Sequence, residues 1–213
     1  MFDADLITRT QEFYRTLAQN NSRDWWQDNR ATYDTAIKPA AEAMLAAITP
    51  RLSDLTGEQV YPKLFRPYHD TRFSKDKTPY KEHLHIAWMI REGRQETGYF
   101  LGIEPDRVLV GGGMMGMDKA VLEDWRKFVD LDAKRVAAIL EQVEGAGFAL
   151  REPELVRAPR GYPVDHPLSR LLRMKAVIAL RPLEPSGDIT DQVMEGFSAY
   201  KPLGDLLLSV SCA

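Results

Sequence analysis

The chain has 213 residues, of which 44% are hydrophobic, and a net charge of −3 at pH 7. This length and composition allow a core without structural crosslinks, and the lone Cys212 excludes an intrachain disulfide framework. The slightly acidic balance excludes a polybasic nucleic-acid coat or membrane-surface protein. No apolar run reaches the roughly 20 residues that span a bilayer. Residues 1–6 show no secretory signal, so we expect a cytoplasmic protein without a membrane partner.

The first quarter of the chain has helical periodicity. Phe13 and Leu17 are four residues apart and share one face of a first predicted helix. Ser22 is a suitable N-cap for a second helix. A third helix, with apolar residues at spacings of three and four between positions 44 and 55, is expected to end at Gly57.

The middle of the chain changes to a period of two, which is typical of strands. Alternation over 83–91 predicts a strand that buries Leu84, Ile86, Trp88 and Ile90 on one face. A polar loop at 92–98 and further alternation at 99–103 and 107–110 predict two hairpins of an antiparallel meander. An earlier strand is expected at 64–66.

The second half of the chain mixes helices with short strands. A helix capped by Asp118 and a helix after it precede predicted strands at 148–151 and 176–180. A last helix is expected to break at Pro202. We therefore predict one α+β domain over residues 1–213, with N-terminal helices packed on a mainly antiparallel sheet and further helices in the C-terminal half.

The densest polar segment runs from Lys63 to Lys81 and carries a net charge of +4, whereas the rest of the chain carries −7. Cations beside hydroxyl groups suit phosphate or carboxylate ligands. We expect the ligand-binding residues to be Arg66, Arg72, Ser74, Lys75, Lys77, Tyr80 and Lys81, with Arg160 from a later loop. Asp70 and Asp76 are candidate catalytic residues that orient these cations or act as a base. The alternative is a solvated loop whose ions pair with one another.

The same segment carries a resemblance to a known family. The stretch from His69 to Lys81 resembles the signature of the bacterial and fungal family called domain of unknown function 2461. The Asn-Asn pair at 20–21 before two tryptophans, and the PRGYP segment at 159–163, resemble two further family features. His69 departs from the family pattern, which has Arg there, and this removes one cation from the patch. The resemblance covers about residues 13–175 and implies a single α+β domain without supplying an activity or catalytic residues.

Two other segments match parts of known functional motifs. The segment Ser74–Lys77 matches the S-x-x-K pattern of penicillin-interacting serine enzymes, but Pro79 stands where their later K-T-G strand would need a glycine. The glycines 111–113 lack the ending of a phosphate-binding P-loop. They predict instead a strand that bends or lies close to another backbone.

His83 and His85 share one face of the predicted strand, as two metal ligands would. A third ligand would come from Asp70, Asp76 or His166. Two histidines at this spacing also occur on any solvated strand face, so no metal is assigned, and the sequence does not identify a cofactor.

Two classes of function follow from the basic segment. In the first, the patch binds a phosphorylated small molecule or nucleotide, with phosphoryl-group or acyl-group chemistry if the protein is an enzyme. In the second, a non-enzymatic binding module uses the patch to contact an acidic protein or a nucleic-acid backbone. Cations that converge in a cleft favour the first class, and cations spread over a convex face favour the second.

Overall fold

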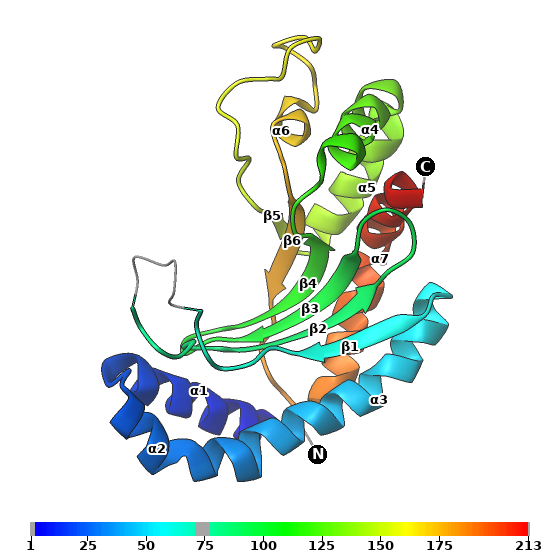
Figure 1. The fold of residues 1–213 in the computed structure, drawn as a ribbon. Coiled ribbons are helices and arrows are strands. Elements are labelled where there is room, and N and C mark those ends of the chain that lie inside the picture. The colour runs from blue at the N-terminus through cyan, green and yellow to red at the C-terminus, as the bar shows by residue number, and fades with distance from the viewer. Residues whose placement is uncertain (1–2, 71–76, 213) are drawn as a thin grey trace.

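The computed structural model describes residues 3–70 and 77–212 (Figure 1). Its elements in chain order are α1 (Ala4–Gln19), α2 (Arg23–Thr32), a π-helical turn (Tyr33–Ile37), α3 (Lys38–Thr56), β1 (Val60–Leu64), β2 (Leu84–Ile90), β3 (Thr97–Ile103), β4 (Val108–Met114), α4 (Lys119–Leu131), α5 (Ala133–Gly145), β5 (Ala149–Leu150), α6 (Ser169–Leu172), β6 (Val177–Pro182) and α7 (Ile189–Cys212). The predicted α+β class is confirmed. Within these two ranges, no helix combines the length and the apolar character that crossing a bilayer requires.

Local sequence signals determine several helix ends as predicted. The Ser22 side chain accepts a hydrogen bond from the Trp25 N–H at the start of α2, and Asp118 accepts one from the Val121 N–H at the start of α4. These caps satisfy amide groups that have no partner inside the helix. Gly57 ends α3 at φ 76°, a left-handed conformation that favours glycine.

One antiparallel sheet lies at the centre, in the strand order β1-β2-β3-β4-β6-β5. Its β2 strand buries Leu84, Ile86, Trp88 and Ile90, as the period of two predicted. The first strand ends at Leu64, so the prediction of a strand at 64–66 was displaced toward the C-terminus. Pro62 obscured the strand pattern in the sequence, because proline is rare inside strands. This proline is tolerated because β1 is an edge strand.

The C-terminal helix α7 packs across one face of the sheet. The Phe197 ring lies 5.3 Å from Trp88 and 5.1 Å from Tyr99, centroid to centroid. A Cβ atom at Gly112 would lie 2.7 Å from the Tyr200 ring, so only glycine lets the helix approach β4 here. The close approach predicted for the glycine run is therefore confirmed.

The expected break of the last helix at Pro202 was wrong, because α7 continues through this residue to Cys212. A proline inside a helix removes one hydrogen bond. Phe197 and Leu203, on the two sides of the proline, are both fully buried. Burial of apolar side chains along the whole helix therefore offsets the local cost of the proline.

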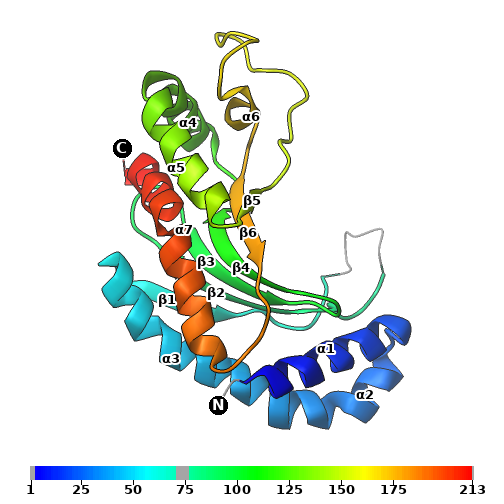
Figure 2. The same ribbon diagram turned by 180° about the vertical axis from the view of Figure 1, so that it is seen from behind.

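The two faces of the sheet differ. Helices α3 and α7 cover one face, and among the described elements no helix lies on the other (Figures 1 and 2). We call this second surface the open face. The larger side chains on the open face are half-buried. They come from β1, β2, β3, β4 and β6 and from the residue that follows β1. These side chains are Tyr61, Phe65, His85, Met89, Phe100, Leu109, Ile178 and Leu180.

Candidate functional site

The chain on either side of residues 71–76 is held together by backbone hydrogen bonds. The His69 N–H donates to the Pro79 carbonyl at 2.9 Å, and the Lys81 N–H donates to the Pro67 carbonyl at 2.7 Å. The His69 side chain adds a bond of 2.9 Å between Nδ1 and the Thr78 carbonyl. Because a carbonyl only accepts, Nδ1 carries the proton. We call these hydrogen bonds the backbone ladder. They place Lys81 close to the start of β2.

Tyr80 anchors the ladder to the helical layer. Its side chain is 6% exposed, and its ring stacks on Trp26 of α2 at 4.4 Å with an interplanar angle of 11°. Burial raises the pKa of the Tyr80 hydroxyl. The structure thus places this predicted ligand-binding residue in the core, where it positions the segment.

Asn21, in the turn between α1 and α2, completes this anchor. Its side-chain amide donates to the Tyr80 carbonyl and to the Glu82 carboxylate, each at 2.9 Å. Its side-chain oxygen accepts from the Tyr80 N–H at 3.2 Å. Sequence patterns gave no role to Asn21, and the Asn-Asn pair of the family resemblance was the one signal that marked it.

Three cations gather where β1 ends and β2 begins. The Lys63 Nζ lies 4.7 Å from the centre of the Phe65 ring, and the Lys81 Nζ lies 5.6 Å from it. Burial, and then the positive charges of Arg66 and Lys63, lower the pKa of Lys81. Within residues 3–70 and 77–212, none of these three cations has a carboxylate within 4 Å.

Aromatic rings continue from these cations onto the open face. The His83 and His85 rings stack at 3.6 Å, and the His85 ring meets Phe100 edge to face at 4.8 Å. We call Lys63, Phe65, Arg66, Lys81, His83, His85 and Phe100 the basic–aromatic cluster.

Both histidines of the cluster are neutral at pH 7. Burial, with smaller effects from His83 and Lys81, lowers the pKa of His85 to about 3. Burial and the Lys81 charge also lower the pKa of His83. The buried Nε2 atom of His85 has no hydrogen-bond partner among the described residues, which costs about 1–3 kcal/mol for a typical buried polar group.

A metal fits these histidines poorly. Among the described residues, no group of three or more His, Cys, Asp or Glu side chains is placed to hold a metal ion. The proposed third ligand His166 belongs to another part of the molecule, where its Nε2 lies 3.3 Å from Asp130. The Lys81 ammonium group would also repel a cation beside His83. The chemistry of the cluster therefore favours an anion.

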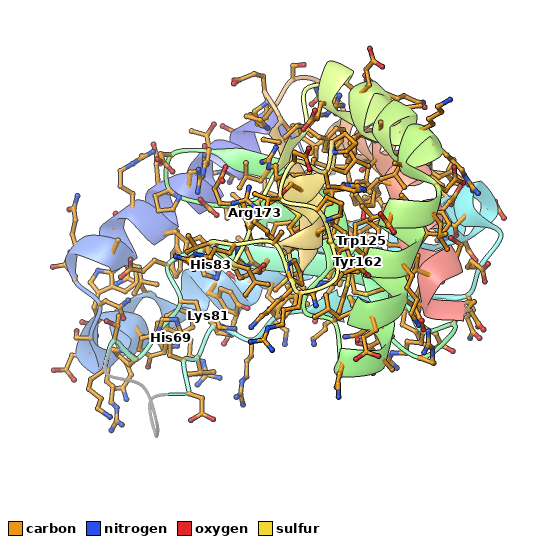
Figure 3. The ribbon with its side chains drawn as sticks, turned by 90° about the horizontal axis from the view of Figure 1, so that it is seen from above. His69, Lys81, His83, Trp125, Tyr162 and Arg173 are labelled. Carbon is orange, nitrogen blue, oxygen red and sulfur yellow. The ribbon has the colours of Figure 1, made fainter. Side chains whose placement is uncertain are left out.

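The other predicted site residues fall into two groups. Arg72, Ser74, Lys75 and Asp76 lie outside the described residues, and the exposed Asp70 and Lys77 are at the ends that flank them. Arg160 is exposed in the loop after β5, at the opposite edge of the sheet from β1. In Figure 3, His69, Lys81 and His83 lie toward α1 and α2, whereas Tyr162 of that loop lies toward α4 and α5. The structure brings Arg66 and Lys81 together with Lys63 and leaves Arg160 apart.

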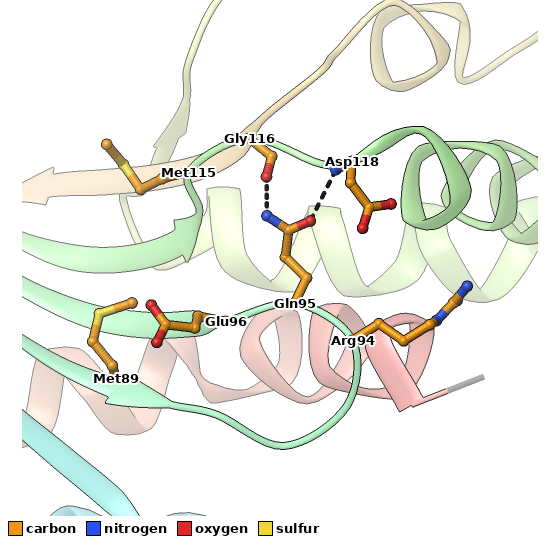
Figure 4. A pocket seen from close by; sticks show the side chains of 7 residues that line it. All are labelled: Met89, Arg94, Gln95, Glu96, Met115, Gly116 and Asp118. Atoms are coloured by element: carbon orange, nitrogen blue, oxygen red, sulfur yellow. Dashed lines mark hydrogen bonds between the residues drawn. The ribbon is translucent and has the colours of Figure 1, made fainter.

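A hollow of about 380 Å³ lies at the other end of β2 (Figure 4). Gln95 spans it, donating to the Gly116 carbonyl and accepting from the Asp118 N–H at 2.9 Å. Arg94 pairs with Asp124 at 2.8 Å. Because internal partners occupy these polar groups, the hollow offers a ligand less than the basic–aromatic cluster does.

Comparison with known proteins supports the resemblance seen in the sequence. No curated protein matches the chain. The family described as "Conserved hypothetical protein (DUF2461)" matches residues 9–205, which include the ladder, the open face and most of α7. The chain therefore belongs to the DUF2461 family of conserved hypothetical proteins.

Proposed function

We propose that the protein binds a small phosphorylated ligand at Lys63, Arg66 and Lys81. The observation that carries this proposal is that Lys63 and Lys81 meet at the Phe65 ring, with the charge of Arg66 acting on Lys81, while no carboxylate of the described residues lies within 4 Å of these three cations. Like charges held close together repel, and a phosphate group removes that repulsion while accepting several hydrogen bonds.

The arrangement also supplies complementary kinds of donor. Arg66 offers a planar fork for two phosphate oxygens, whereas Lys63 and Lys81 act as point charges. The Asn21 anchor and the backbone ladder hold Lys81 in place before any ligand arrives. A preorganised set of cations loses less entropy on binding than a mobile one. The catalytic roles expected of Asp70 and Asp76 stay predictions, and the function proposed from the described residues is binding.

Titration calorimetry with pyrophosphate at low salt tests this function. We expect the wild type to bind, and Lys63→Met and Lys81→Met each to raise the Kd roughly tenfold, because each removes one charge from the site. The matched control is Lys134→Met, since Lys134 is exposed on α5, far along the chain from the cluster. No pyrophosphate binding, or equal Kd values for all three variants, would overturn the proposal. Binding of a nucleic-acid strand without pyrophosphate binding would favour the macromolecular partner instead.

A further inference from the structure

The aromatic half of the basic–aromatic cluster has no role in holding a phosphate. Phe100 is half-buried at the centre of the open face, where the chain could have placed a polar side chain facing solvent. His85 links it to the cations, since its ring lies 4.8 Å from Phe100 and 6.4 Å from Phe65. A continuous aromatic surface thus leads from Lys63 and Lys81 onto the sheet.

The four positions of the sheet directly next to Phe100 are small residues, although the Met89 side chain lies over Gly98. Ala87 and Gly111 are its partners across β2 and β4, and Gly98 and Gly102 stand two positions away on β3. The Phe100 ring leans over Gly102, where an added Cβ would lie 2.9 Å from two ring atoms. No side chain larger than a methyl group therefore rises beside the ring from these four positions. The low surface next to the Phe100 ring leaves room for a second flat ring to stack on it.

We propose that the ligand of this site is a mononucleotide, with its phosphate on Lys63, Arg66 and Lys81 and its base stacked on Phe100 beside His85, whose ring stands at 74° to that of Phe100. The inference rests on the proposed function and adds the class of ligand. Aromatic side chains on an uncovered antiparallel sheet stack on nucleobases, whereas a sugar phosphate has no planar ring to place there. His85 is neutral, so it presents an uncharged ring to the base.

The charge distribution favours one nucleotide over a nucleic-acid strand. The cations of the cluster sit at one end of the open face. Farther across, the face carries Leu109, Ile178 and Leu180. Arg91, beside Tyr61 at the far end of β1, already pairs with Glu96 at 2.8 Å. A strand that ran on across the described part of this face would place its further phosphates beside apolar side chains, in a chain whose net charge is −3.

Calorimetry with AMP and ribose 5-phosphate tests the inference. The wild type should bind AMP roughly tenfold more tightly than ribose 5-phosphate, because stacking of one base typically contributes an effect of this size. Phe100→Leu should remove this advantage and leave the Kd of ribose 5-phosphate unchanged. The matched control Phe128→Leu, on α4, should leave both values unchanged.

A second variant and a direct measurement keep the inference testable if the Phe100→Leu protein does not fold. His85→Leu, which removes the ring beside the base, should also reduce the preference for AMP, and nuclear Overhauser effects in NMR spectra should connect the adenine protons of AMP to the Phe100 ring in the wild type. Equal affinity for AMP and ribose 5-phosphate would overturn the nucleotide inference and leave the proposed function standing. Failure of pyrophosphate and both phosphorylated ligands would overturn the proposed function itself. A single-stranded oligonucleotide that binds far more tightly than AMP would overturn the mononucleotide assignment.

Discussion

The side chain of Asn21 bonds both backbone polar groups of Tyr80, as a neighbouring strand would do. The two residues are 59 positions apart. Through this pairing, the turn between the first two helices sets the position of the chain that leads into β2. It therefore places Lys81 and His83, one and three residues later, beside β1.

Replacement of Asn21 by alanine should destabilise the protein. The variant loses three hydrogen bonds and leaves a half-buried backbone without its partner, so we expect a loss of about 2–3 kcal/mol in the free energy of unfolding. Urea denaturation measures this loss. The control is Asn20→Ala, which removes one exposed bond to the Thr16 carbonyl and should cost less than about 1 kcal/mol. Equal losses in the two variants would show that the Asn21 anchor contributes nothing special.

Tyr80 should behave as a core residue and not as a ligand donor. Tyr80→Ala removes a buried ring stacked on Trp26, which typically costs about 3–5 kcal/mol of stability. Tyr80→Phe keeps the stack, so it should leave the Kd for pyrophosphate unchanged. Calorimetry on the folded Tyr80→Phe protein checks this point, and a severalfold weaker Kd would return the hydroxyl group to the ligand site.

The stacked histidines should make stability depend on pH. Their pKa values in the folded protein lie below the ordinary 6.5. Burial lowers the pKa of His83 most, Lys81 and His69 lower it further, and Glu104 and Glu82 oppose them. As the pH falls below 6.5, the unfolded chain therefore takes up protons first, and the free energy of unfolding falls until the folded pKa is reached.

The variant His85→Phe isolates this effect. From pH 7 to pH 5, the wild type should lose about 1–2 kcal/mol through His85 alone, and the variant should not. The variant should also be no less stable at pH 7, because it removes a buried nitrogen that has no partner among the described residues. Denaturation curves at both pH values measure the difference. Parallel losses in the two proteins would show that His85 titrates normally.

Short-range signals in the sequence account for much of the fold. Ser22, Asp118 and Gly57 act on residues within one turn of helix, and the alternation around Trp88 follows from one buried sheet face. The break expected at Pro202 failed because burial of α7 against the sheet outweighs a local preference.

The site was less predictable because its parts meet through long-range contacts. The sequence placed Lys63, Arg66 and Lys81 in one basic segment, but it did not assign Lys63 to the site. Lys63 and the ring of Phe65 join the site through the pairing of β1 with β2. Phe100 joins His85 only through the register of β3. No local pattern contains these registers, since a shift of one residue would turn every side chain to the other face.

We infer that the cations of the cluster are held together for an anion that the described part of the chain does not supply. The variant Lys81→Met tests this inference most directly. It keeps a long apolar side chain against Phe65 and removes the ammonium charge. The pKa of Lys81 is lowered by burial and by the charges of Arg66 and Lys63, so this charge is unfavourable without a ligand. Without ligand, the variant should be more stable than the wild type by a few tenths to about 1 kcal/mol. With pyrophosphate at 100 times the wild-type Kd, the wild type should gain about 2.7 kcal/mol and the variant much less, so the order reverses. Urea denaturation of both proteins, with and without pyrophosphate, gives the four values. A variant that is less stable without ligand, and that gains as much from pyrophosphate as the wild type, would contradict the account.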